Sequence, residues 1–418
     1  MTNFKYRYCS LNKLVFMASF VWSVSSVTWA QMESSSHAMS ADSIKSATCI
    51  GSSLDCANAA TPFLTNEGKL VLVWTAGGAV SVARSDDFGK TFSPAVKIAE
   101  HGKWLDTGSD ARPQLVVDSK GHILIAYAFF KDTQWNAQIN TVRSLDGGRT
   151  FTSPEPLIKD GTSERFPMTL IGPDGGIFMT WIDKRLLDAA KLKGVKKLGA
   201  SIAYSFSNDG GKTFKSERIA NEDSCECCRI GASLDPKGRI IIAYRAIFPN
   251  SIRDHATQII SSQGPEKIRR ISNDEWKTDA CPHHGPSIAI SDSDTIHTAW
   301  FTQGKVRSGV FYAHSKDHGA NYSTPIPIGK EGALISRPNL LAIGNSVWMV
   351  WKEFDGQKAL IFMKKSNDDG KTWSPEKSLL QTSGYSDHPL LISMGGQVFL
   401  SWLTRIDGYR LIEIGLAE

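Results

Sequence analysis

Short apolar segments that end in an aromatic residue recur along the chain at a nearly constant interval. The first reads LVLVW and the second ILIAY, and successive terminal aromatics lie 53, 54, 63, 56, 51 and 51 residues apart. Apolar runs of this length, rich in β-branched residues and preceded by turns, predict strands rather than helices. A repeat of about 50 residues that holds several strands is typical of β-propeller blades. The seven segments end at Trp74, Tyr127, Trp181, Tyr244, Trp300, Trp351 and Trp402.

A second motif, Ser-x-Asp-x-Gly-x-Thr-aromatic, follows most of these strands. Its carboxylate can accept bonds from backbone N–H groups, its glycine can take a positive φ, and its aromatic residue can pack into the blade. The motif therefore predicts a structural turn between two strands. One copy carries Asn321 in place of Thr, and the five copies are Ser85–Phe92, Ser144–Phe151, Ser207–Phe214, Ser315–Tyr322 and Ser366–Trp373.

This turn resembles the Asp-box (BNR) repeat of the sialidase superfamily. The resemblance implies an all-β chain that forms a single β-propeller of four-stranded antiparallel blades. Seven aromatic-ended strands favour seven blades, and six blades is the alternative because sialidases themselves have six. The propeller is expected over residues 44–418, with the segment Ile44–Ile50 supplying the outer strand of the last blade.

The first thirty residues have the pattern of a secretory signal peptide. Three basic residues precede an apolar run over Leu14–Val24, and small residues then lead to a cleavage site ending at Ala30. We expect residues 1–30 to be removed, residues 31–43 to form a flexible segment, and the protein to be secreted or periplasmic. No later stretch is apolar over the roughly 18 residues that a membrane-spanning helix needs.

The charge of the mature chain is nearly balanced. The chain has 47 basic and 42 acidic residues, and Lys5, Arg7 and Lys13 lie in the signal segment, which leaves 44 basic residues and a net charge of +2. Binding to nucleic acid needs a concentrated basic field. The sequence therefore predicts no nucleic-acid partner.

In a propeller, the loops that lead into the innermost strands share one face, beside the central channel. We refer to them as the inner loops. Guanidinium groups bind carboxylates in a bidentate manner, so arginines that converge there predict an anionic small molecule or glycan as the ligand. The alternative is that each arginine pairs with a neighbouring carboxylate and ties blades together. The candidate ligand-binding residues are Arg112, Arg165, Arg229, Arg337 and His388.

The resemblance to sialidases extends to parts of the catalytic pattern. Asp110-Ala111-Arg112-Pro113 looks like the motif that supplies the first substrate-binding arginine, and Arg337 could stand for the third. Lys131-Asp132 resembles the loop of the acid/base aspartate, and Tyr385 matches the position of the nucleophilic tyrosine. Glu353 or Asp279 could then assist the tyrosine. The segment Asp279–Gly285 departs from the family, because histidines and a cysteine replace the second arginine.

Six cysteines remain in the chain once Cys9 leaves with the signal segment, and all six lie in inner loops. Cys49 and Cys56 are expected to form a disulfide with each other. The remaining residues allow either disulfides between blades or a site for copper or zinc, because soft sulfur with imidazole suits Cu(I) and Zn(II). The candidate metal ligands are Cys225, Cys227, Cys228, Cys281, His283 and His284.

Three functions follow from these patterns. The first is recognition of an anionic or metal ligand at a channel mouth lined by Arg, His and Cys. The second is an exo-sialidase that cleaves terminal sialic acid. The third is a copper- or zinc-binding protein outside the cytoplasm.

Overall fold

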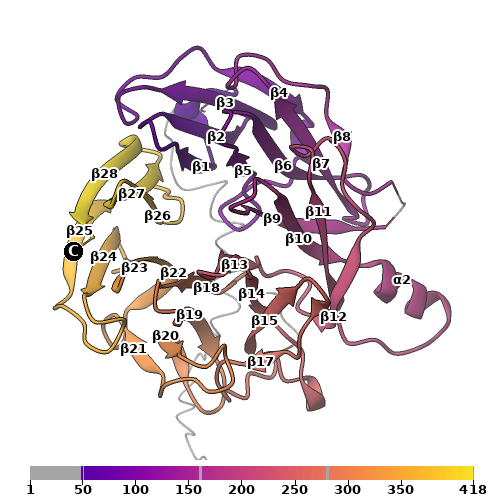
Figure 1. Ribbon diagram of the computed structural model, residues 1–418, viewed down its shortest axis with the longest axis vertical. Coiled ribbons are helices and arrows are strands. Elements are labelled where there is room, and N and C mark those ends of the chain that lie inside the picture. Colours follow the sequence, from indigo (N-terminus) through magenta and orange to yellow (C-terminus); the bar gives the residue numbers. More distant parts are fainter. Residues whose placement is uncertain (1–48, 50, 160–161, 279–281, 418) are drawn as a thin grey trace, which may run out of the picture. The chain divides into compact units, whose positions relative to one another are not determined.

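Seven antiparallel sheets are arranged around a ring, and each forms one blade of a β-propeller (Figure 1). The computed structural model describes Cys49 and residues 51–159, 162–278 and 282–417. Within each sheet, hydrogen-bonded neighbours follow one another in the chain, as in an up-and-down meander. The preferred prediction of seven blades is therefore confirmed, and the six-bladed alternative is wrong.

The first four blades lie between β1 and β17. Blade 1 comprises β1 (Ala59–Leu64), β2 (Leu70–Ala76), β3 (Ala79–Ser85) and β4 (Val96–Glu100). Blade 2 comprises β5 (Gln114–Val117), β6 (Ile123–Phe130), β7 (Ala137–Ser144) and β8 (Glu155–Pro156). Blade 3 comprises β9 (Glu164–Ile171), β10 (Ile177–Asp183), β11 (Ala200–Ser207) and β12 (Arg218–Ser224). Blade 4 comprises β13 (Gly231–Leu234), β14 (Ile240–Arg245), β15 (His255–Ser261), β16 (Gly264–Pro265) and β17 (Arg269–Arg270).

The last three blades complete the ring. Blade 5 comprises β18 (Ser287–Ile290), β19 (Ile296–Gln303), β20 (Ser308–Ser315) and β21 (Ile326–Ile328). Blade 6 comprises β22 (Leu334–Ile343), β23 (Ser346–Phe354), β24 (Ala359–Ser366) and β25 (Lys377–Thr382). Blade 7 comprises β26 (Leu390–Met394), β27 (Gln397–Thr404) and β28 (Gly408–Leu416). The described helices are η1 (Leu54–Cys56), η2 (Gly102–Trp104), α2 (Arg185–Leu192) and η3 (Pro249–Ser251).

The repeated aromatic residues lie in the second strand of every blade and are 2% exposed or less. Their rings fill the space between neighbouring blades. Trp181 of blade 3, for example, shares a core cluster with Leu124 and Ala126 of blade 2. Trp402 of blade 7 similarly packs in one cluster with Val350 of blade 6. The sequence period thus reflects one large buried side chain for each interface between blades.

The ring closes where blade 7 meets blade 1. Trp74 of β2 shares a core cluster with Leu403 of β27. Polar contacts join the same blades, because the Ala60 amide donates a hydrogen bond to Asp387 Oδ2 over 3.0 Å. Blade 7 has three strands among the described residues, and its predicted fourth strand, Ile44–Ile50, lies outside them apart from Cys49. The predicted signal peptide and the segment 31–43 also lie outside the described residues.

The five Ser-x-Asp turns share one hydrogen-bonding pattern. In the first, the amide and hydroxyl of Thr91 donate to the two Asp87 carboxylate oxygens over 2.8 and 2.6 Å. Ser85 Oγ accepts a bond from the Gly89 amide over 2.8 Å. These donors, the Thr91 hydroxyl foremost, lower the pKa of Asp87 to about 2. The carboxylates thus serve the turns, as the sequence predicted.

The one α-helix among the described residues is short. It is α2, with eight residues, and it lies in the long loop between β10 and β11. No helix in the described part of the chain has the length and apolar character needed to cross a membrane.

Candidate functional site

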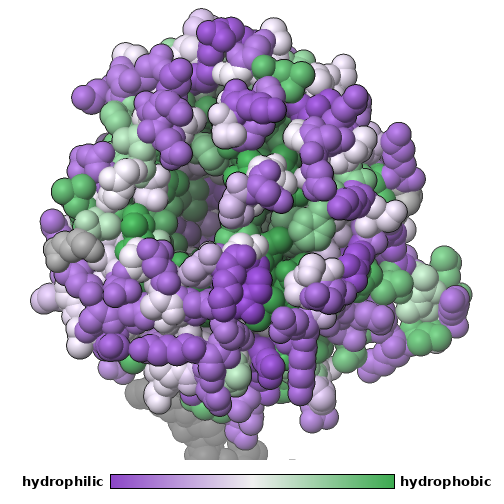
Figure 2. Space-filling view, in the orientation of Figure 1, coloured by the Kyte–Doolittle hydropathy of each residue, from purple (hydrophilic) through white to green (hydrophobic). Residues whose placement is uncertain are grey.

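Several inner loops meet over the middle of the ring. Asp110, in the loop before β5 of blade 2, contacts Arg229 of blade 4 and Arg337 of blade 6. Such contacts between non-adjacent blades require the loops to reach across the ring. Figure 2 shows the ring hollowed near its middle, with hydrophilic groups inside the hollow. We define the mouth cluster as Asp110, Arg112, Arg229, His284, Arg337, Lys352, Asp387 and His388.

Asp110 is the central carboxylate of the mouth cluster. Its Oδ1 lies 3.0 Å from Arg229 Nη1, and its Oδ2 lies 3.2 Å from Arg337 Nη2. The three side chains are 14–20% exposed. Burial alone would raise the pKa of Asp110, but the positive charges of Arg337 and Arg229 outweigh it and lower the pKa. Asp110 is therefore ionised and holds both guanidinium groups.

Arg112 forms a second ion pair. Its Nη2 donates to Asp387 Oδ1 over 2.6 Å, and its Nη1 and Nε donate to the carbonyls of Ala60 and Ser109 over 2.8 and 2.9 Å. Asp387 also accepts bonds from the amides of Ala60 and His388. Arg112 thus joins blade 2 to blades 1 and 7. This pair fits the alternative raised from the sequence, in which an arginine pairs with a carboxylate of a neighbouring blade and ties the blades together.

The electrostatics of the mouth cluster are dominated by cations. Burial lowers the pKa of His388 well below its usual value, and the charges of Arg337 and Arg229 lower it further. The His284 ring stacks on the Phe301 ring with 4.0 Å between their centres. Burial and the charge of Arg337 lower the pKa of His284 well below its usual value too. Both imidazoles are therefore neutral near pH 7.

Lys352 completes the positive side of the mouth cluster. Burial and the charge of Arg337 lower its pKa to about 8, and its Nζ donates to the Ser386 carbonyl over 3.2 Å. Three arginines and one lysine thus face two carboxylates among the described residues, a surplus of two positive charges (4 − 2).

Two residues that precede a proline in the inner loops have a positive φ. Arg337 precedes Pro338 with a φ of 57° and lies at a register shift in the pairing of β22 with β23. A positive φ is unfavourable for such a residue and persists where the surroundings hold it. Phe166 precedes Pro167 in blade 3 with a φ of 55°.

Because Phe166 occupies the position before the proline, Arg165 is directed elsewhere. Its Nε and Nη2 form a bidentate pair with Asp106 at 2.6 and 2.8 Å. Its guanidinium also lies 4.4 Å from the centre of the Phe166 ring. The structure thus pairs Arg165 with Asp106 and not with the Asp110 that holds Arg229 and Arg337.

The described residues expected from sialidases each have hydrogen-bond partners of their own, beginning with Tyr385. The Tyr385 hydroxyl donates to the Asn58 carbonyl over 2.8 Å and lies 3.4 Å from Ser109 Oγ. Burial of this hydroxyl and the charge of Asp387 raise its pKa to about 12, although 42% of the whole side chain is exposed. A tyrosine with a raised pKa is a poorer nucleophile.

The two predicted catalytic carboxylates have other partners. Asp132 accepts bonds from the Gln134 and Asn136 amides over 2.9 and 3.1 Å, so it stabilises its own turn. Glu353 is 4% exposed and accepts a bond from Trp351 Nε1 over 2.8 Å. The described contacts of Tyr385 include neither carboxylate. Asp279 lies outside the described residues.

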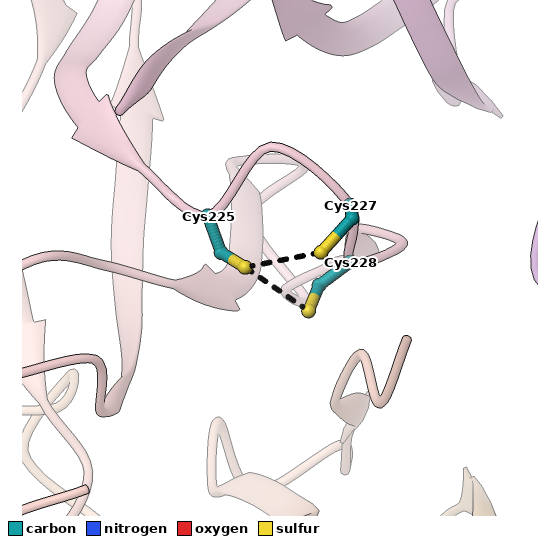
Figure 3. Close-up of side chains that lie close together, drawn as sticks. All are labelled: Cys225, Cys227 and Cys228. Carbon is teal, nitrogen blue, oxygen red and sulfur yellow. Dashed lines mark hydrogen bonds between the residues drawn. The ribbon is translucent and has the colours of Figure 1, made fainter. Parts of the chain in front are cut away.

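The predicted disulfide between Cys49 and Cys56 is confirmed. A separate group of three buried cysteines lies in the loop between β12 and β13. Cys225 Sγ is 3.5 Å from the sulfurs of both Cys227 and Cys228 (Figure 3). We call this group the cysteine cluster. Cys281 lies outside the described residues.

Hydrogen bonds from the Cys227 and Cys228 thiols lower the pKa of Cys225 well below its usual value. Cys225 in turn raises the pKa of Cys228 to about 12. The two predicted histidine ligands contact Arg337: the His283 carbonyl accepts a bond from Arg337 Nη1, and His284 Nδ1 lies 3.4 Å from the same nitrogen. Among the described residues, the group that could hold a metal consists of the three cysteines alone.

A cavity opens among the Ser-x-Asp turns. It has a volume of about 1130 Å³ and is lined by turns of blades 1, 2 and 3. Its carboxylates include Asp87 and Asp146, which are already engaged by Thr91 and Thr150. This cavity gathers no group of side chains suited to catalysis, so the mouth cluster is the better candidate site.

Sequence reasoning missed some partners in these sites. Lys352 and Asp387 belong to loops that the sequence placed at the channel mouth, but nothing in the sequence paired Asp387 with an arginine 275 positions earlier. Arg253, whose Nη1 lies 3.8 Å from Cys225 Sγ, gave no sequence signal.

Comparisons with known proteins give structural matches alone. No family profile and no curated protein matches the chain. An ulvan lyase of polysaccharide lyase family PL25, solved bound to -[GlcA(1-4)Rha3S]-, has a TM-score of 0.56 at 11% identity, covering 85% of this chain and 91% of its own. The polysaccharide lyase Uly1 has a TM-score of 0.51 at 11% identity, covering 86% and 87%. A Hadza microbial sialidase has a TM-score of 0.49 at 14% identity, covering 84% and 74%. The chain therefore shares its fold with the two polysaccharide lyases.

Proposed function

We propose that this protein is a carbohydrate-active propeller that binds an acidic sugar at the mouth cluster. The observation that carries the proposal is the surplus of positive charge. Arg112, Arg229, Arg337 and Lys352 face the carboxylates of Asp110 and Asp387, and both neighbouring imidazoles are neutral. A partly buried surplus of this kind attracts an anion, because the local dielectric is lower than that of water.

The guanidinium groups of Arg229 and Arg337 suit a carboxylate or sulfate group. Each is partly exposed, at 20% and 16% of its side chain, and each contacts the carboxylate of Asp110. Arginine donates several N–H groups in one plane, so a second anion can bind the donors that Asp110 leaves unused. Arg112 is less suited, because all three of its nitrogens already donate to protein oxygens.

Tyr385 supplies a surface for the sugar ring. Its side chain is 42% exposed while its hydroxyl is fixed by Asn58. A rigid, partly exposed aromatic ring beside cationic groups binds amphipathic ligands at a low entropic cost. The ulvan lyase of similar fold is bound to an acidic saccharide, which supports the same class of ligand. The export that residues 1–30 predict is part of the proposal.

Binding is favoured over hydrolysis by a tyrosine nucleophile. The raised pKa of Tyr385 opposes deprotonation, and Asp132 is engaged in its own turn. Retaining glycosidases need the two catalytic groups close to the scissile bond. We therefore assign recognition of an acidic sugar as the function, with sialic acid and uronic acids as the sugars to compare.

Calorimetric titration with glucuronate oligosaccharides, sialyllactose and neutral lactose tests the proposal. We expect saturable binding of an acidic ligand, a loss of at least tenfold in affinity in Arg337→Met, and no change in Arg149→Met. Arg149 is an exposed arginine in an Asp-box turn and is the matched control. Equal binding of neutral lactose, or an unchanged affinity in Arg337→Met, would refute the proposal.

The same samples report on catalysis. Unsaturated uronate products and release from a fluorogenic sialoside are measured in parallel. Turnover of the sialoside that is lost in Tyr385→Phe would replace the binding assignment by sialidase activity.

A further inference from the structure

Three cysteine sulfurs converge from one short loop. Cys225 Sγ lies 3.5 Å from Cys227 Sγ and 3.5 Å from Cys228 Sγ, and all three side chains are 4% exposed or less (Figure 3). A metal–sulfur distance of about 2.3 Å places the sulfurs of one tetrahedral or trigonal site roughly 3.8–4.0 Å apart. The observed spacing of 3.5 Å is slightly shorter, so a small movement of the sulfurs would bring all three to one ion.

The loop that carries the cysteine cluster is fixed at both ends. The Cys225 amide donates to the Arg245 carbonyl over 2.9 Å, and Ser224 pairs with Ala246 in an isolated bridge. On the other side, Cys228 is followed by Arg229, which Asp110 holds. The sulfurs are thus presented by a backbone that is already positioned.

A buried arginine, Arg245, and a partly buried arginine, Arg253, face the cysteine cluster. Arg245 Nη1 lies 3.9 Å from the sulfurs of both Cys225 and Cys228, and Arg253 Nη1 lies 3.8 Å from Cys225 Sγ. Arg245 is 1% exposed, and its guanidinium lies 3.6 Å from the centre of the Trp276 ring.

Neither arginine forms an ion pair with a carboxylate among the described residues. Moreover, Arg245 Nη2 and Arg253 Nε are buried and have no hydrogen-bond partner within the described part of the chain. A buried cation without a counter-charge is costly. The negative charge that these guanidinium groups require is best supplied by ionised sulfur.

We propose that Cys225, Cys227 and Cys228 bind one Cu(I) ion as thiolates. Three thiolates and Cu(I) together carry a charge of −2, which the guanidinium groups of Arg245 and Arg253 balance. Soft sulfur ligands favour Cu(I), Zn(II) and iron–sulfur clusters. Zn(II) would leave a net positive charge at a buried site and normally takes four protein ligands in structural sites. The cysteine cluster is separate from the acidic-sugar site, so this proposal does not depend on the proposed function.

Competition titration of the full chain tests the copper site. Protein purified under reducing, anaerobic conditions is titrated with Cu(I) in the presence of a chromogenic Cu(I) chelator. We expect one equivalent of Cu(I) per chain. Cys228→Ser should lower the affinity by at least about 100-fold, since it removes one of three ligands. The double variant Cys49→Ser with Cys56→Ser, which removes the disulfide pair, should bind as the wild type does.

Arg245→Met separates the counter-charge from the ligands. This variant should keep one equivalent of Cu(I) but bind it about tenfold more weakly, in line with the effect of outer partners on metal affinity. X-ray absorption of the loaded wild type should show sulfur coordination, a readout that does not depend on a variant that folds. The thermal midpoints of the variants verify that they are folded.

Three results would overturn the proposal. The first is a wild-type protein that fails to hold Cu(I) although its thiols are reduced. The second is binding of Zn(II) that excess Cu(I) does not displace. The third is copper coordination by nitrogen or oxygen without sulfur.

Discussion

Replacing Arg112 by methionine should weaken the closure of the propeller more than it weakens ligand binding. Methionine keeps most of the length and apolar surface of the arginine stem but donates no hydrogen bonds. The change removes the ion pair from Arg112 to Asp387 and two bonds to backbone carbonyls. Asp387, whose side chain is 2% exposed, then keeps only amide donors.

The expected loss follows from the burial of the pair. Removing one partner of a buried ion pair costs about 3–5 kcal/mol, because the remaining charge is left uncompensated. Arg112 and Asp387 are 7% and 2% exposed, so solvent screens them little. With an unfolding entropy of about 2.1 cal/mol/K per residue, a chain of this size should lose about 4–6 °C in thermal midpoint.

A double-mutant cycle tests the assignment. Arg112→Met, Asp387→Asn and the double variant are compared by calorimetric unfolding. The double variant should be more stable than the sum of the single losses predicts by about 1–3 kcal/mol, because it leaves no unpaired charge. Additive losses, or an Arg112→Met variant as stable as the wild type, would contradict the role of Arg112 as a tie between blades. A large loss of affinity for acidic sugars at unchanged stability would restore it as a ligand-binding residue.

Three further predictions concern charge. In Asp110→Asn, the guanidinium groups of Arg229 and Arg337 lose their internal anion. Calorimetric titration should then show an affinity for acidic sugars that is about tenfold higher, while the thermal midpoint falls. A drop in affinity would contradict this. The pKa of Lys352 is lowered from 10.5 to about 8, so unfolding takes up a proton between these two pH values. From pH 8 to 10.5 the free energy of unfolding measured by denaturant titration should therefore rise, while the affinity for acidic sugars falls. Neither trend should appear in Lys352→Met. The pKa of Asp87 is lowered from 3.8 to about 2. The Asp87 carboxylate therefore contributes to stability above pH 3.8, and this contribution should be lost as the pH falls through 2. Thr91→Val, which removes the hydroxyl donor, should move acid unfolding to a higher pH.

Much of the fold could be predicted because the same local interactions recur in every blade of the propeller. Each repeat needs one bulky side chain for the interface with its neighbour, and Trp74 and Trp402 mark the first and last of these positions. Each Ser-x-Asp turn satisfies its own backbone within eight residues, as in Ser85–Phe92, so its role is local and visible in the sequence. Blade number follows directly from such local signals.

The site could be predicted in position but not in pairing. Inner loops were expected to bring arginines to one face, and Arg229 and Arg337 do meet there. Their common partner, Asp110, lies 227 positions from Arg337, and no local pattern links residues at that separation. Arg165 was expected at the mouth but pairs with Asp106 instead. Arg165 stands one position earlier than Arg337 relative to its proline, because Phe166 occupies the position directly before the proline.

The loop between β12 and β13 carries residues of both proposed sites. Cys228 and Arg229 are consecutive, yet the first is 2% exposed beside Arg245 and the second reaches Asp110 of another blade. Arg245 has no carboxylate partner among the described residues, whereas Arg229 shares one with Arg337. In the proposed copper site, sulfur neutralises Arg245, so this arginine adds nothing to the positive charge of the mouth. The surplus of positive charge at the mouth then rests on Arg112, Arg229, Arg337 and Lys352 against two carboxylates, and this is the surplus that the proposed anionic ligand would neutralise.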